Sequence, residues 1–313
     1  FGRLLTGQLR EMWERLEQPA RFELVECGAG RGLLGAQILQ AAGEQAPDFG
    51  RALQLTLVEA SPRLREEAGA ALAKFGEQAR VADRLPAGGI VGCVLSNELV
   101  DALPVHRVVR RAQGLREIYV SARHGELVEI EEELSSPELA PYLDRYGAPL
   151  QDDQQAEVHL AALAWLGQAA QALTRGFLLT LDYGYRAYEL YGPAHRRGTL
   201  LAYRNHRTRD DWLAWPGQQD LTAQVNFTAL EERGRELGLV TLGYTQQTNF
   251  LLALARASGL VERLEREAET PEARATRNQL KQLIHPEGMG EAFKVLLQGK
   301  GIEGAVLSGL QLL

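Results

Sequence analysis

Glycines at alternate positions mark the segment Glu26–Gly32 (ECGAGRG), which lies between an apolar run and a segment whose apolar residues recur at helical spacing. Alternate glycines let the backbone turn tightly and let a cofactor approach it without meeting a Cβ atom. The dinucleotide pattern G-x-G-x-x-G would need a third glycine at the position of Leu33. The spacing therefore favours a loop for S-adenosylmethionine, with Gly28, Gly30 and Gly32 as cofactor contacts. A tight turn without a ligand is the alternative.

Acidic residues stand at or near the ends of two apolar runs. Glu59 follows the run 53–58 and lies 27 residues after Gly32. A carboxylate there can accept hydrogen bonds from both ribose hydroxyls of an adenosine, whether that adenosine belongs to a nicotinamide cofactor or to adenosylmethionine. Glu26 could contact the methionine amino group of the cofactor. Ser61 is also predicted to contact the cofactor. For Glu26 and Glu59 the alternative is a solvated acid at a strand end.

A second polar group, formed by Asn97, Glu98 and Asp101, follows another apolar run. Methyl transfer starts from an activated sulfonium, so the protein mainly has to align the nucleophile with the methyl group and exclude water. Carboxylates can hold a cationic or amine acceptor and help to remove its proton. We therefore predict that these three residues are catalytic, the alternative being that the carboxylates cap the following turn. Asp182, at the end of the run 177–181, is a predicted cofactor contact in the same pocket.

A parallel sheet would bring these residues together. Apolar runs at 22–27, 53–58, 89–96 and 177–184 predict buried strands, and helical spacing predicts helices after the first two. Ser61 followed by proline predicts that the second helix begins near residue 62. Successive strand–helix units imply right-handed crossovers and a doubly wound Rossmann-like α/β sheet. Further predictions are helices at 154–173, 227–237 and within 250–283, a strand at 240–243, and edge strands at 292–298 and 305–312.

Two stretches interrupt the α/β pattern. Residues 105–130 alternate apolar and polar, with glycines at the turn points, which predicts an antiparallel meander. Residues 186–226 are rich in glycine, proline and aromatic residues and lack periodicity, which predicts a long ordered loop. We interpret about 105–150 and 186–226 as inserted, substrate-facing elements of a single methyltransferase domain spanning 1–313.

Composition limits the classes of function. The chain carries 41 acidic and 34 basic residues, a formal net charge of -7, and no strongly basic run, so no nucleic-acid partner is expected. Cys27 and Cys93 lie in or beside apolar runs, which favours buried thiols and a reducing compartment, the cytoplasm or, in a eukaryote, the mitochondrial matrix. No apolar stretch approaches the roughly 18 residues of a membrane-spanning helix. No two histidines have the i, i+4 spacing of a helical zinc site, so no metal is predicted.

Six blocks of the sequence carry a family resemblance. They are 25–32, 58–64, 96–105, 181–185, 198–200 with His206, and 216–227. In this order they resemble the MidA-like family of S-adenosylmethionine-dependent methyltransferases across nearly the whole chain. The blocks 96–105 (SNELVDALPV) and 216–227 (PGQQDLTAQVNF) are far more specific than the glycine loop.

The resemblance implies an adenosylmethionine-binding Rossmann-like domain with a family-specific insertion. One mitochondrial member of the family methylates protein arginine and assists assembly of respiratory complex I. The resemblance therefore implies a protein arginine as acceptor, with a respiratory-complex subunit as one candidate partner. Cys27 and Ala29 replace residues commonly found in the glycine loop of the family, and Asn226 stands where an aspartate is usual. Because Phe1 resembles the end of the family's amino-terminal region, a preceding segment is expected to be missing.

The leading hypothesis is therefore methyl transfer to a protein arginine, with Glu98 and Asp101 orienting the guanidinium. One alternative is a non-catalytic assembly or binding factor that keeps the cofactor fold and uses its aromatic loop as a contact surface. Another is a nicotinamide oxidoreductase, which Leu33 disfavours. The sequence does not indicate an oligomeric state.

Overall fold

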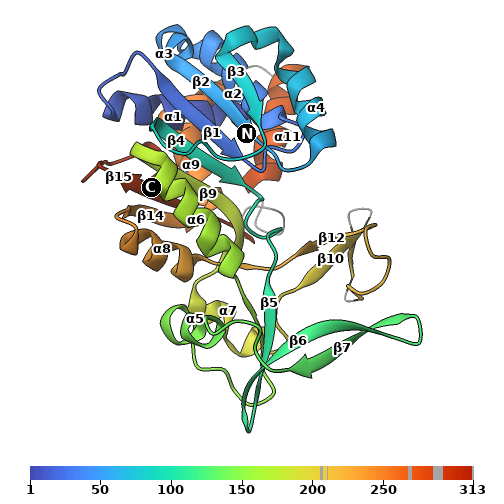
Figure 1. Ribbon diagram of the computed structural model, residues 1–313. Coiled ribbons are helices and arrows are strands. Elements are labelled where there is room, and N and C mark those ends of the chain that lie inside the picture. Colours follow the sequence, from blue (N-terminus) through green and yellow to red (C-terminus); the bar gives the residue numbers. More distant parts are fainter. Residues whose placement is uncertain (205–206, 210, 267–269, 285–291, 312–313) are drawn as a thin grey trace. The chain divides into compact units, whose positions relative to one another are not determined.

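The chain forms two compact units in the computed structural model, which describes residues 1–204, 207–209, 211–266, 270–284 and 292–311 (Figure 1). Unit 1 consists of Phe1–Glu98, Gly167–Asp182 and Gly234–Leu313. Unit 2 consists of Leu99–Leu166 and Tyr183–Arg233. Unit 2 is thus made of two insertions into the sequence of unit 1, and these insertions contain the stretches that interrupt the predicted α/β pattern.

A mostly parallel sheet forms the centre of unit 1, in the strand order β3-β2-β1-β4-β9-β15-β14. Strand β1 pairs in parallel with β2 and β4, β2 with β3, and β4 with β9, whereas β14 and β15 are antiparallel. This topology confirms the predicted Rossmann-like sheet. The strands are β1 Phe22–Cys27, β2 Leu53–Val58, β3 Ala79–Ala82, β4 Ile90–Asn97, β9 Leu173–Tyr185, β14 Val240–Gln246 and β15 Phe293–Lys300.

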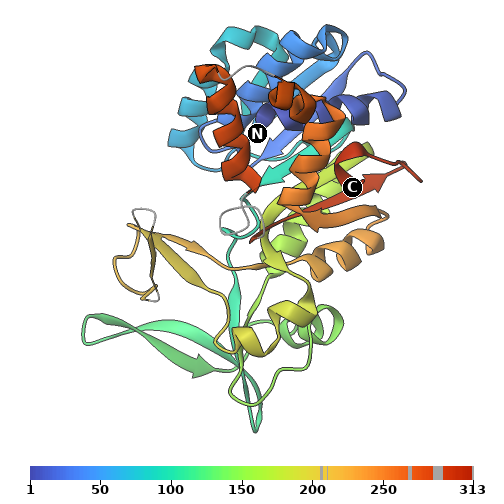
Figure 2. The same ribbon diagram turned by 180° about the vertical axis from the view of Figure 1, so that it is seen from behind.

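Helices cover both faces of this sheet. In α1, Leu5, Leu9 and Met12 recur at i, i+4 and i+7 and are fully buried in one cluster with Leu24 of β1 and Phe177 of β9. Figure 2 shows α9 and α11 over this sheet from one side, whereas the second half of α6 crosses it on the side seen in Figure 1. The helices are α1 Gly2–Arg15, α2 Leu33–Gln45, α3 Pro47–Ala52, α4 Pro62–Leu72, α6 Leu160–Ala172, α9 Gln247–Ala257, α10 Leu260–Arg266 and α11 Pro271–Ile284, with the 3-10 turns η1 Ala73–Gln78 and η4 Ser308–Leu310.

Two glycines let the central strands of unit 1 pair. Gly92 of β4 and Gly176 of β9 have φ values of 154° and 141°. A Cβ atom on Gly176 would lie 2.0 Å from the carbonyl oxygen of Gly92, and one on Gly92 would lie 2.1 Å from that of Glu23. Only glycine fits either position without moving a backbone.

Antiparallel strands build unit 2. Its larger sheet has the order β7-β6-β5-β8, with β5 His106–Arg111, β6 Gly114–Arg123, β7 Glu126–Glu132 and β8 Gln155–Val158. This sheet confirms the meander predicted at 105–130. Val108 of β5 packs with Leu139 and Tyr142 of α5 Leu139–Tyr146.

The second inserted stretch of unit 2 is more regular than a loop. It contains a small sheet of order β11-β10-β12, and β13 pairs in parallel with the end of β9 through Gly184 and Tyr185. The prediction of a long loop without regular structure over 186–226 is therefore wrong. The elements are α7 Ala187–Leu190, η2 Pro193–His195, β10 Leu201–Arg204, β11 Arg207–Arg209, β12 Asp220–Thr222, β13 Val225–Asn226 and α8 Phe227–Glu236.

Three other predictions need correction. The helix expected at 154–173 begins only at Leu160, because residues 155–158 pair with β5 as strand β8. The strand predicted at 292–298 exists as β15 but lies between β14 and β9 rather than at an edge. Residues 305–311, the described part of the last predicted strand, hold the turn η4 and no strand. Pairing with distant strands decided the first two cases, and such pairing is not visible in the local sequence pattern.

Candidate functional site

The carboxyl ends of four adjacent strands of unit 1 form the candidate site. The chain places β2 and β3 on one side of β1, and β4 and β9 on the other. In open α/β sheets, ligands bind outside the carboxyl ends of the strands at such a reversal. The register sets Cys27 beside Val58 and Ser96, and Asn97 beside Leu181. The residues at this end of the strands therefore lie along one edge of the sheet. Gly28, Glu59 and Glu98 follow β1, β2 and β4, and Asp182 is the residue after Leu181 within β9.

The glycine loop leaves β1 in a left-handed conformation. Gly28, Gly30 and Gly32 have φ values of 70°, 55° and 73°. The backbone nitrogen of Gly28 donates to the carbonyl of Val58 at 2.9 Å, which ties the loop to β2. A Cβ atom on Gly30 would meet nothing within 4 Å, whereas one on Gly32 would lie 2.8 Å from Cδ1 of Leu57. Gly30 thus faces open space, and Gly32 permits close packing of the loop on β2.

Glu59 is held by the backbone on both of its carboxylate oxygens. Oε2 accepts a hydrogen bond from Gly30 N at 2.8 Å, and Oε1 accepts one from Ser61 N at 2.9 Å. A carboxylate offers about four lone-pair positions, so two remain for the hydroxyls of a ribose. Together with the open space at Gly30, these free positions fit the adenosine part of the predicted cofactor.

Two further contacts fix the segment around Glu59. Ser61 caps α4, because its Oγ accepts a hydrogen bond from Leu64 N at 3.4 Å. Arg65 donates from Nη1 to the carbonyls of Glu59 at 2.9 Å and Ala60 at 2.7 Å. Arg65 was not among the residues predicted from the sequence. Its position in the first turns of the helix that Ser61 begins is the signal that could have suggested a contact with the preceding strand end.

Glu26 is buried instead of solvated. It is 4% exposed, and a Cβ atom on Gly35 of α2 would lie 2.8 Å from Oε2, so glycine at that position leaves room for the carboxyl group. Burial raises the pKa of Glu26 to about 8, although a hydrogen bond from the backbone of Gly35 acts in the opposite direction. Oε2 has no hydrogen-bond partner among the described residues. Glu26 therefore holds a proton near neutral pH and can lose it when a positive charge approaches.

Asn97 and Glu98 come at the end of β4, opposite the end of β9. Glu98 has a φ of 53°, which is uncommon for a residue with a side chain. Its backbone nitrogen donates to the carbonyl of Leu181 at 3.0 Å, and its Oε1 accepts from Nδ2 of Asn97 at 3.2 Å. Burial raises the pKa of Glu98, and the amide of Asn97 opposes that rise. Asp182, the next residue of β9, is fully buried.

Asp101 belongs to unit 2, so the structure does not group it with the other predicted site residues. It is 5% exposed, and its main-chain oxygen accepts a hydrogen bond from Ala223 N at 3.0 Å. This contact joins the two sequence blocks that carried the strongest family resemblance. His206, from a third block, lies outside the described residues.

Asn226, where the resemblance expected aspartate, has a structural role in unit 2. Its Oδ1 accepts a hydrogen bond from Ala229 N at 3.1 Å, as an N-cap of α8 does. Its Nδ2 donates to the carbonyl of Tyr146 at 2.9 Å. An aspartate could accept the first bond but could not donate the second, which explains why an amide suits this position.

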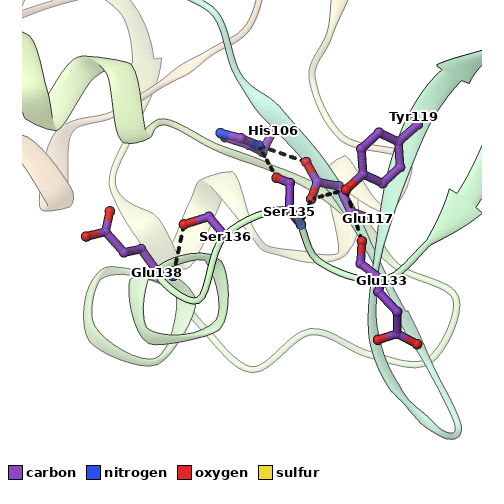
Figure 3. A network of polar contacts seen from close by, with 7 residues as sticks. All are labelled: His106, Glu117, Tyr119, Glu133, Ser135, Ser136 and Glu138. Carbon is purple, nitrogen blue, oxygen red and sulfur yellow. Dashed lines mark hydrogen bonds and ion pairs between the residues drawn. The ribbon is translucent and has the colours of Figure 1, made fainter.

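A polar network in unit 2 was not predicted from the sequence (Figure 3). Glu117 of β6 accepts hydrogen bonds from Ser135 N at 2.6 Å and from the hydroxyl of Tyr119 at 3.1 Å, and its Oε1 lies 2.8 Å from Nδ1 of His106. Burial alone would raise the pKa of Glu117, but the bonds from Ser135, His106 and Tyr119 outweigh it and lower that pKa. The network ties the segment after β7 to β5 and β6.

This network does not have the geometry of a nucleophilic triad. Ser135 Oγ lies 3.4 Å from Nδ1 of His106, the same ring nitrogen that meets Glu117. A serine–histidine–acid relay needs the serine and the acid on opposite ring nitrogens. In Figure 3 the second ring nitrogen of His106 points away from Glu117. The position of His106, directly after the block 96–105, was the available sequence signal.

The part of the chain that the structure describes contains neither a metal-binding group nor a membrane-spanning helix. No group of three or more histidine, cysteine, aspartate or glutamate residues there could hold a metal ion. No helix among these residues is long and apolar enough to cross a membrane.

Comparisons with known proteins agree with this geometry. Residues 4–245 match the model of a family described as S-adenosyl-L-methionine-dependent methyltransferase. A solved structure from Burkholderia thailandensis, bound to S-adenosyl-homocysteine, is 31% identical to this chain. It superposes with a TM-score of 0.84 over 99% of this chain and 78% of that one.

Curated relatives extend the match. The protein arginine methyltransferase NDUFAF7, mitochondrial, of Homo sapiens is 28% identical, over 97% of this chain and 72% of its own length. The protein of the same name from Mus musculus is 27% identical, over 94% of this chain and 70% of its own length. The site at the strand ends agrees with the family model and with the S-adenosyl-homocysteine bound to the solved relative. This chain is an S-adenosylmethionine-dependent methyltransferase of the MidA-like family.

Proposed function

We propose that this enzyme transfers the methyl group to an arginine side chain of a protein, and that Glu98 and Asp101 orient the guanidinium. The observation that carries the proposal is Glu98, an acid in a strained conformation at the end of β4, in the same row of strand ends as the glycine loop and Glu59. Residues in such conformations persist where the surrounding structure holds them, and they are concentrated at active sites. The names of the curated relatives support arginine as the acceptor.

Each chosen residue has a distinct part in this proposal. Glu59 and Ser61, with the glycine loop and Asp182, hold the cofactor, which supplies an activated methyl group. Glu98, held by the amide of Asn97, accepts hydrogen bonds from the acceptor guanidinium. Glu98 must be ionised for this, so a cationic acceptor lowers its raised pKa on binding. Asp101 follows Glu98 by three residues, so the chain keeps it within about 11 Å of Glu98.

Cofactor binding is the first experiment. S-adenosylmethionine and S-adenosylhomocysteine are titrated calorimetrically into the wild type, Glu59→Gln and the exposed control Glu77→Gln. We expect Glu59→Gln to weaken both ligands by about tenfold or more, because an ionised acceptor is lost, and Glu77→Gln to match the wild type. Equal affinity for all three proteins would remove Glu59 from the cofactor site.

The acceptor is tested with methyl-labelled cofactor. The enzyme is incubated with a cell extract, and labelled residues are identified by mass spectrometry. Label on arginine that disappears in Glu98→Gln and in Asp101→Asn, while cofactor affinity is retained, is the expected result. Label only on other residues or on small molecules would contradict the arginine acceptor. Absence of any transfer, with a protein partner still retained, would favour the assembly-factor alternative.

Location and partner belong to the same proposal. The curated relatives carry "mitochondrial" in their names, which supports a mitochondrial-matrix location if the source is a eukaryote, and a cytoplasmic one otherwise. A respiratory-complex subunit is then a candidate acceptor. Fractionation of source cells, with the enzyme detected by antibody, checks the location.

A further inference from the structure

Unit 2 contains a polar cavity that the proposed chemistry does not use. Its volume is about 680 Å³, within the usual range for a ligand site. It is lined from several segments that are distant in sequence, including β5, β7, β8 and the stretch around β10. The residues used below are Arg107, Glu129, Tyr185, His195, Arg197 and Trp212.

Arg107 already contacts three residues of unit 2. Its guanidinium forms an ion pair with Glu129, donates to Oε1 of Gln155 at 3.0 Å, and lies 4.8 Å from the ring centroid of Trp212. The Arg107 side chain is only 10% exposed. The negative charge of Glu129 is therefore neutralised, and one face of Trp212 is covered.

The charge in the cavity that no neighbouring side chain neutralises is positive. Arg197 is exposed, and its guanidinium makes no hydrogen bond or ion pair with any described residue. His195 uses Nδ1 against the carbonyl of Glu189 at 3.0 Å, which requires a proton on Nδ1 and leaves Nε2 for a ligand. The tilted rings of His195 and Tyr185, with centroids 5.0 Å apart, add an aromatic wall.

One buried acid, Glu157, does not offset this charge. Glu157 is fully enclosed, and its Oε2 accepts hydrogen bonds from Thr199 N at 2.8 Å and Thr199 Oγ1 at 3.0 Å. Burial raises the pKa of Glu157, opposed by Thr199 and by the charge of Arg107. Because Glu157 does not line the cavity, a ligand there meets Arg197 instead.

We propose that this cavity binds a carboxylate side chain of the acceptor protein, with Arg197 as the principal contact. The inference deepens the proposed function, and rests on it, because only a polypeptide acceptor brings an acidic residue to unit 2. The chemistry selects acceptor proteins that present a glutamate or aspartate side chain. A guanidinium ligand is disfavoured, because the acid that it would need is paired with Arg107 and one face of the ring that it would stack on is already covered.

The test uses two peptides and the whole protein without cofactor. One acetylated and amidated peptide has a central arginine flanked on each side by Gly-Glu-Gly, and its twin has glutamines in place of the glutamates. The indole N–H signal of Trp212 is followed by NMR and assigned by Trp212→Phe among the four tryptophans of the chain. Arg197→Gln removes the contact, and Arg123→Gln, an exposed arginine outside the cavity, is the matched control.

We expect the glutamate peptide to shift the Trp212 signal saturably and its twin to bind about tenfold more weakly or worse. Arg197→Gln should lose the preference, Arg123→Gln should keep it, and added salt should weaken it. Equal binding of the two peptides, or no saturable shift with either, would overturn the inference. The readout needs no methyl transfer, so carboxylate binding without arginine methylation would contradict only the proposed function.

Discussion

The two units hold their polar residues in different ways. In unit 1, Gly28, Glu59 and Glu98 follow the ends of the parallel strands β1, β2 and β4, and Asp182 lies in the adjacent strand β9 next to Leu181. In unit 2, the network around Glu117 joins β5, β6 and the segment after β7, and its members come from separate stretches of chain.

Sequence patterns predict neighbouring residues in the parallel sheet of unit 1 better than in the antiparallel sheet of unit 2. The carboxyl ends of parallel strands necessarily share one edge of the sheet, so an apolar run followed by a polar residue already indicates a shared location. In an antiparallel meander the neighbours depend on register, and a shift of one residue turns each side chain to the other face. The network of Glu117 therefore could not be inferred from its sequence positions alone.

The largest expected effect tests how tightly each unit packs its backbone. Gly176→Ala in unit 1 should cost about 3 kcal/mol or more, because the new Cβ atom would lie 2.0 Å from the Gly92 oxygen. Gly125→Ala in unit 2, at a φ of 85° with nothing within 4 Å, should cost only about 1 kcal/mol. Urea unfolding measures both free energies, and similar costs would show that the sheet relaxes around the added methyl group.

Glu26 should make unit 1 less stable as the pH rises. Its folded pKa of about 8 lies above the ordinary value of 4.5, so its favourable contribution is complete below pH 4.5 and is lost as the pH rises to 8. Glu26→Gln should therefore be more stable than the wild type at pH 8, by roughly 2 to 4 kcal/mol, and not at pH 4.5. Thermal unfolding across this range, with Glu77→Gln as control, measures the difference, and a difference independent of pH would count against a buried neutral acid.

Glu117 should show the opposite sign in unit 2. Because its folded pKa is lowered, its contribution is present above the unfolded pKa and disappears as the pH falls through the folded value. Glu117→Gln should cost about 1 kcal/mol at pH 7 and progressively less toward pH 3. Unfolding by urea at pH 3, 5 and 7 provides the measurement. A cost that grows on acidification would mean that the carboxylate is not held by its donors.

The smallest expected effect concerns Glu98. Glycine accepts a φ of 53° without strain, so Glu98→Gly should leave stability unchanged or raise it by up to about 1 kcal/mol while methyl transfer is lost. Glu66→Gly, at an exposed position of α4, should instead cost about 1 kcal/mol. Calorimetric unfolding compares the two, and equal costs would argue that Glu98 is not strained.

Some predictions from the sequence are confirmed and others are wrong, and the reasons are physical. The strands at 22–27, 53–58 and 89–96 agree with β1, β2 and β4, because strands buried on both faces are continuous apolar runs. Residues 155–158 were misassigned to a helix, because only pairing with β5 makes them a strand. Arg65 and Glu117 were missed, because an isolated charged residue has no pattern until its partners are placed.

The sequence predicted an adenosylmethionine cofactor from the glycine spacing and the family resemblance, and it predicted acids at neighbouring strand ends, because successive strand–helix units indicate a parallel sheet. Only the tertiary structure decided which acids are neutral and which are ionised. Glu26 and Glu117 are the same residue type, each in a strand, and their pKa values move in opposite directions. The reason is that burial with a single backbone donor favours the neutral acid at Glu26, whereas donors from His106, Tyr119 and Ser135 favour the carboxylate at Glu117.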